Sequence, residues 1–141
     1  MFDTLKELIF GRKAVDTSVE AKRIRKVVMG MVDPFIRAVE AYEKEDDKSL
    51  VYFNEFIKEY INLQRIMKNK SDYKRYKLAL EKIIRFGKSE DMVIYIRVFN
   101  KLARQLVNVS EYYKLRRFKK GDDLFDDFLT GFENMVERLN K

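Results

Sequence analysis

Apolar residues recur at helical spacing along most of this chain, and this pattern constrains its fold more than any other feature. The clearest stretch opens at Ser89, with Glu90 and Asp91 in its first turn, and keeps one apolar face to about Phe118. We find no convincing strand pattern and no internal repeat. The sequence therefore predicts an all-α fold, a single-domain bundle of about five to six mostly antiparallel helices over residues 1–141.

Cap and turn residues divide the first third of this pattern. Residues 1–11 predict a short amphipathic helix at 2–10 that Gly11 ends, and the bundle core is expected over 17–141. Thr17 and Glu20 have the spacing of a capping box before a helix that extends to Tyr42. Because a proline inside a helix loses a hydrogen bond, Pro34 predicts either a kink or a restart of this helix.

The remaining helices are also bounded by turn residues. One helix is predicted over about 49–68, and the next is expected to begin after Ser71 and to stop at Gly87. Gly121 is expected to break the helix that opens at Ser89. Asp122 or Asp123 would then cap a last helix that reaches Leu139.

The composition disfavours most catalytic chemistry. The chain has no histidine and no cysteine, so it offers neither an imidazole base nor a thiolate nucleophile. It also has no glycine-rich phosphate loop and no nucleophile elbow. We therefore expect a protein that is not an enzyme and that needs no cofactor.

A cluster of carboxylates opens the predicted last helix. Asp123 and Asp127 are four residues apart on one helical face and form the best candidate for a Mg²⁺ site, and thus for a nuclease. The favoured interpretation is electrostatic, because acidic residues stabilise the positive end of a helix. On this interpretation, the basic run before the cluster serves the negative end of the preceding helix. We expect no metal site.

Three basic clusters are the strongest functional lead. The formal net charge is +7 with a pI near 9.5, which favours a polyanionic partner. Each cluster contains few acids, and together they would form a track for phosphates if they lay on one face. The residues predicted to contact nucleic acid are Lys22, Arg23, Arg25, Lys26, Lys74, Arg75, Arg116 and Arg117.

Five tyrosines lie in or near these clusters and are candidates for stacking on unpaired bases, namely Tyr52, Tyr73, Tyr76, Tyr112 and Tyr113. We expect sequence-tolerant binding of DNA or RNA backbone, as a small subunit of a nucleoprotein assembly. The alternative is a protein–protein adaptor or a self-assembling, coat-like homo-oligomer that binds another protein and no nucleic acid. No transmembrane segment is expected, the predicted location is cytoplasmic, and the Lys- and Glu-rich composition leans towards a thermophile.

Overall fold

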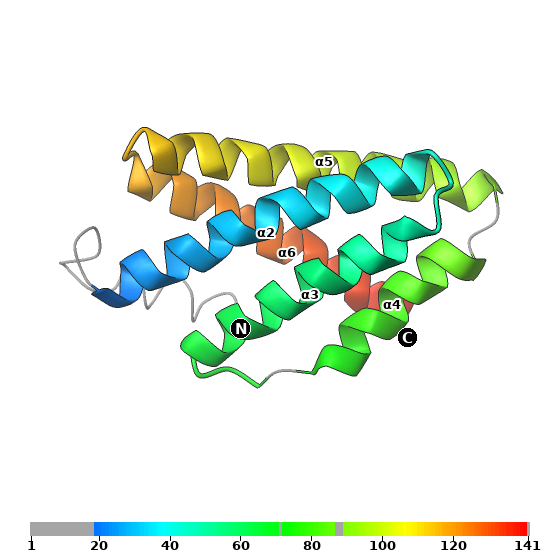
Figure 1. Cartoon of the computed structure of the whole chain (residues 1–141), viewed down its shortest axis with the longest axis horizontal. Helices are drawn as coiled ribbons and strands as arrows, with labels where there is room; N and C mark the ends of the chain where they lie inside the picture. The colour runs from blue at the N-terminus through cyan, green and yellow to red at the C-terminus, as the bar shows by residue number, and fades with distance from the viewer. Residues whose placement is uncertain (1–18, 71, 87–88, 141) are drawn as a thin grey trace.

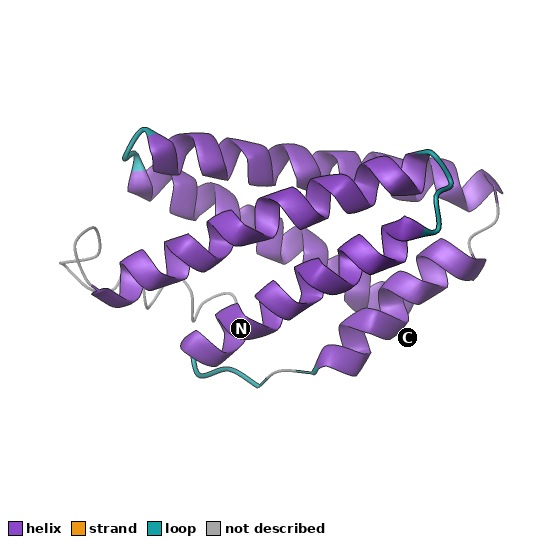
Figure 2. Ribbon diagram, viewed as in Figure 1, coloured by secondary structure: helices purple, strands orange, loops and turns teal. Residues whose placement is uncertain are grey.

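Helices form almost all of the part of the protein that the computed structural model describes, which comprises residues 19–70, 72–86 and 89–140. They hold 89% of these residues, and no strand occurs among them (Figure 2). The all-α bundle is confirmed. The described helices are α2 (Val19–Glu43), α3 (Lys48–Ile66), α4 (Tyr73–Phe86), α5 (Ser89–Lys114) and α6 (Phe118–Leu139).

The contacts between helices form a ring in the order α2, α3, α4, α6, α5, which surrounds one core. Figure 1 shows the directions of these helices. α2 lies antiparallel to α3, and α5 lies antiparallel to α6, as short connections favour. α2 also contacts α5, while the shorter α4 contacts α3 and α6 and closes the ring. The start of α2, the end of α5 and the start of α6 therefore lie at the same end of the molecule, which we call the basic end.

Phenylalanine side chains fill the space that these helices enclose. Phe35 is fully buried, and its ring meets those of Phe53, Phe56 and Phe128 edge to face, at centroid distances of 5.8, 4.9 and 5.6 Å. This geometry is favourable for aromatic pairs. All five described helices contribute to the buried cluster, so the helical spacing in the sequence located the core correctly.

Pro34 does not divide its helix. α2 is continuous from Val19 to Glu43 with Pro34 inside it, so the predicted restart is wrong. Proline leaves the carbonyl four residues earlier without its usual donor, and that residue is Gly30. Gly30 is exposed, so water can replace the missing donor at low cost. The apolar stripe on both sides of Pro34 stabilises one uninterrupted helix.

Gly121 lies inside α6 and does not break a helix, which corrects two predictions. α5 ends at Lys114, earlier than expected, and α6 begins at Phe118, so neither Asp122 nor Asp123 caps it. The chain reverses where Arg116 adopts a left-handed conformation with φ of 60°. Gly121 is needed for packing, because a Cβ atom there would overlap the ring of Tyr113.

The structure tests some of the other predicted helix boundaries and does not describe the rest. α3 matches the predicted helix at 49–68 closely. At the start of α4, the carboxylate of Asp72 accepts the backbone N–H of Arg75 at 3.2 Å, a contact typical of a cap. The helix at 2–10, Thr17, Ser71 and Gly87 lie outside the described residues. Among the described helices, none has the length and apolar character needed to cross a bilayer.

Candidate nucleic-acid interface

The first turns of α2 separate their basic residues into two groups. Ile24 and Val28 face the core, which places Lys22, Arg23 and Lys26 on the solvent side. Arg25 follows Ile24 and points inward, where it is only 5% exposed. The structure therefore removes Arg25 from the exposed residues predicted to contact nucleic acid.

Arg25 instead holds α2 against the start of α6. Its Nη2 lies 2.7 Å from Oδ2 of Asp122, and its Nε donates to Oδ1 at 3.2 Å. The hydroxyl of Tyr113, at the end of α5, donates to the same Oδ1 at 2.6 Å. Burial and the negative charge of Asp122 raise the pKa of Tyr113, which keeps its phenol neutral. This cluster joins three helices at the basic end.

Phe118 lies beside this cluster. The guanidinium carbon of Arg25 is 4.4 Å from the centroid of the Phe118 ring, a distance typical of a cation–π contact. Phe118 is the first residue of α6 and is only partly buried. Our sequence reasoning missed it, although an aromatic residue set within a basic run was a visible signal.

Basic residues also surround the start of α6. Lys119 and Lys120 lie in its first turn, Arg116 and Arg117 precede it, and this turn contains no acidic residue. The residue at the N-cap position, Arg117, makes no capping hydrogen bond through its side chain. The positive end of a helix favours anions, so these cations are placed against the local field. The expectation that the aspartates occupy this turn is wrong.

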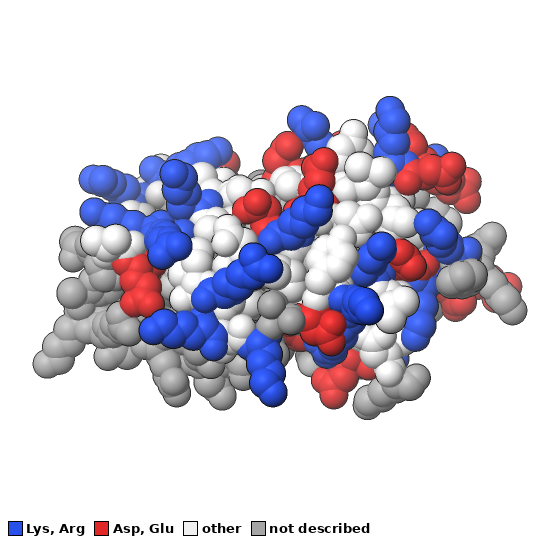
Figure 3. Space-filling view, turned by 60° about the horizontal axis from the view of Figure 1, so that its bottom comes forward, with Lys and Arg blue, Asp and Glu red and all other residues white. Residues whose placement is uncertain are grey.

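Two groups of exposed basic residues meet around one hollow. We call them the α2 cluster (Lys22, Arg23 and Lys26) and the α5–α6 cluster (Arg116, Arg117, Lys119 and Lys120). Lys22, Lys26 and Arg116, all exposed, line an open cavity of about 600 Å³ together with Met29 and Phe118. Figure 3 shows Lys and Arg side chains gathered at this end of the molecule, whereas acidic and basic side chains mix at the other end. Two of the three predicted basic clusters therefore converge.

No residue of the third basic cluster lines this hollow, and Arg75 lies away from it. Lys74 is exposed at the start of α4, but Nη1 of Arg75 pairs with Oε2 of Glu133 at 3.0 Å. Partial burial lowers the pKa of Arg75, but the hydrogen bond and charge of Glu133 outweigh that effect and raise it. Glu133 follows Asp122 by eleven residues in α6, or roughly 16 Å along the helix axis. Arg75 is therefore remote from the hollow and already paired.

The five candidate tyrosines also divide by burial. Tyr76 and Tyr113 are 2% and 6% exposed, so their predicted role in stacking on bases is wrong. Tyr52, Tyr73 and Tyr112 remain partly exposed. Of these, Tyr112 lies at the basic end, where Arg117 and Lys120 approach its ring to 5.8 and 6.0 Å.

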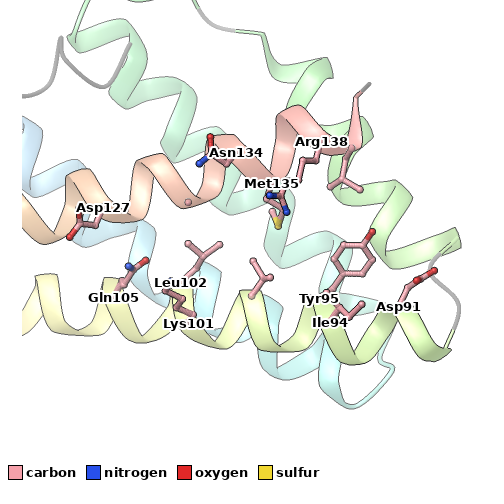
Figure 4. A pocket seen from close by; sticks show the side chains of 13 residues that line it. Asp91, Ile94, Tyr95, Lys101, Leu102, Gln105, Asp127, Asn134, Met135 and Arg138 are labelled. Carbon is pink, nitrogen blue, oxygen red and sulfur yellow. The ribbon is translucent and has the colours of Figure 1, made fainter.

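The carboxylates of α6 face in different directions. Asp122 and Asp126 are buried, whereas Asp123 and Asp127 are exposed. Asp127 lines a separate groove of about 540 Å³ between α5 and α6, and Asp91 lies at its opposite end (Figure 4). Among the described residues, no group of three or more acidic side chains is arranged to hold a metal ion.

Comparison with known proteins adds no assignment. No protein-family model matches the chain, and neither the curated proteins nor the solved structures give a match.

Proposed function

We propose that this chain is a non-enzymatic protein that binds the phosphate backbone of nucleic acid at its basic end, as a small subunit of a nucleoprotein assembly. The observation that carries the proposal is the convergence of the α2 and α5–α6 clusters around one hollow. Lys22, Lys26 and Arg116 come from distant parts of the sequence, yet they are exposed side by side. Such a cluster fits a polyanion better than any small set of partner carboxylates.

The electrostatics of α6 support the same proposal. Lys119 and Lys120 in its first turn repel the positive end of their own helix, and this arrangement lowers the stability of the free protein. A bound phosphate would relieve that repulsion, because both the cations and the positive end of the helix favour an anion. A feature that is unfavourable in the free protein and favourable in the complex is typical of a binding site.

The proposal is tested by fluorescence anisotropy with labelled DNA and RNA over a salt series. The triple variant Lys22→Gln, Lys26→Gln and Arg116→Gln should weaken binding at least ten-fold at low salt. It should also flatten the slope of log K against log salt by about one unit for each phosphate contact removed. The loss should be similar for all base sequences.

A matched control distinguishes this site from net charge. Lys44→Gln, Arg85→Gln and Arg97→Gln remove the same charge near the opposite end of the bundle, and they should leave affinity within about two-fold. Equal losses of affinity in both triple variants would show that binding depends on the net charge of the protein and not on this site. If the unmodified protein shows no binding at low salt, the proposal is wrong, and the search turns to a protein partner.

A further inference from the structure

The hollow at the basic end contains more than cations. Buried Arg25 and Tyr113 form its floor, while exposed Lys22, Lys26 and Arg116 form its rim. Met29 and Phe118 also line the hollow, and both are partly exposed. An apolar and aromatic wall inside a cationic rim is unexpected for a surface that serves only phosphates.

We infer that this hollow receives an unpaired nucleobase, with the flanking phosphates on Lys22, Lys26 and Arg116. The preferred ligand would then be single-stranded nucleic acid. This inference rests on the proposed function, because it names the ligand class of the same site. A base presents a π face that stacks on an aromatic ring regardless of its sequence, while the adjacent backbone needs cations.

The Phe118 ring is held in place before any ligand arrives. Arg25 lies over it at 4.4 Å, and Arg25 is itself fixed by two hydrogen bonds to the buried Asp122. A rigid ring loses little conformational freedom on binding, so most of the stacking energy contributes to affinity. The buried ion pair that takes Arg25 away from solvent thus positions the aromatic wall.

The size and lining of the hollow favour a single strand over a duplex. About 600 Å³ lies within the usual range for small-ligand sites, which is enough for one nucleotide. In a duplex, the bases are paired and stacked, and turning one outward is costly. A duplex therefore reaches only the cationic rim, whereas a single strand reaches the rim and the wall together.

An oligonucleotide without bases separates these two contributions. We would compare a thymine strand of about 12 nucleotides, an abasic strand with the same number of phosphates, and a duplex of the same length. The thymine strand should bind tightest at a given salt. Phe118→Leu should weaken it roughly ten-fold and leave the abasic strand and the duplex unchanged, while Phe118→Tyr should retain the preference.

Tyr95→Leu is the matched control, because Tyr95 is a partly exposed aromatic residue in the α5–α6 groove. It should leave all three affinities unchanged. Equal binding of the thymine and abasic strands, with no effect of Phe118→Leu, would overturn the inference and leave backbone binding intact. Equal losses of all three ligands in Phe118→Leu would also overturn it, since the ring would then only support the fold. Absence of all binding would reject the proposed function itself.

Discussion

Two arginines that look alike in the sequence have different roles in the structure. Arg25 and Arg75 each lie in a basic cluster, and each pairs with a carboxylate of α6. The side chains of Arg25 and Asp122 are 6% and 0% exposed, whereas those of Arg75 and Glu133 are 31% and 8% exposed. One ion pair is fully buried, and the other is open to solvent on its cationic side.

The partners of the two carboxylates differ as well. Asp122 receives two hydrogen bonds from Arg25 and one from Tyr113. Glu133 receives a single hydrogen bond from Arg75, and the hydroxyls of Tyr60 and Tyr76 donate to its other oxygen at 2.6 and 2.5 Å. The buried cation dominates the first cluster and the neutral phenols dominate the second. The first should therefore depend more strongly on its charge.

Neutralising each carboxylate tests this difference directly. Asp122→Asn removes the charge opposite a buried guanidinium, and it should lower the free energy of unfolding by about 3–5 kcal/mol. Glu133→Gln should cost about 1–3 kcal/mol, because its carbonyl oxygen still accepts phenol hydrogen bonds and Arg75 can be hydrated. Urea denaturation followed by circular dichroism measures both values. Equal losses would contradict the comparison.

A double variant shows whether the buried pair stabilises the fold in itself. Replacing Arg25 with Met and Asp122 with Leu in a Tyr113→Phe background removes both charges and leaves no buried hydroxyl without its acceptor, and it should be less destabilising than Asp122→Asn in the same background. Nucleic-acid affinity should nevertheless fall, because Phe118 loses the guanidinium that positions it. A variant that is more stable than Asp122→Asn but binds nucleic acid more weakly than the unmodified protein would separate the structural role of the pair from its role at the hollow.

Two glycines that both lie inside helices allow a smaller comparison, between a buried glycine and an exposed one. Gly121→Ala places a methyl group against the Tyr113 ring, and it should destabilise the protein by about 1–3 kcal/mol. Gly30→Ala is the matched control, because its methyl group would meet only the Glu59 carboxylate at 3.4 Å. It should stabilise α2 by about 0.5–1 kcal/mol through helix propensity. Thermal unfolding measures both changes in stability, and a stabilised Gly121→Ala or a destabilised Gly30→Ala would contradict the prediction.

The sequence predicted the helices well, because their formation depends on periodic burial. The stripes around Phe35, Phe56 and Phe128 place these residues in the core without any knowledge of partners. The prediction failed at Gly121, where helical glycine and turn glycine have the same one-letter signal. Only the neighbouring helix, through Tyr113, shows why glycine is required there.

The candidate site was less predictable, because it depends on which side of a helix meets a distant segment. The periodicity of α2 could have placed Arg25 beside Ile24 on the core side, but its partner Asp122 lies 97 positions later. No local pattern joins the two. Phe118 could not be predicted for the same reason, because its importance follows from its contact with Arg25, which is distant in the sequence.

The second cluster should also contribute a measurable response to alkaline pH through Tyr76. Burial, followed by the hydrogen bond and charge of Glu133, raises the pKa of Tyr76 from 10.0 to about 12. The unfolded chain therefore loses this proton first as pH rises, so the free energy of unfolding should fall between pH 10 and about 12, and not below that window. Tyr76→Phe removes one titrating phenol, and its stability should fall less steeply over this range. Denaturation at successive pH values measures both slopes, and identical slopes would show that the folded protein does not raise the pKa of Tyr76.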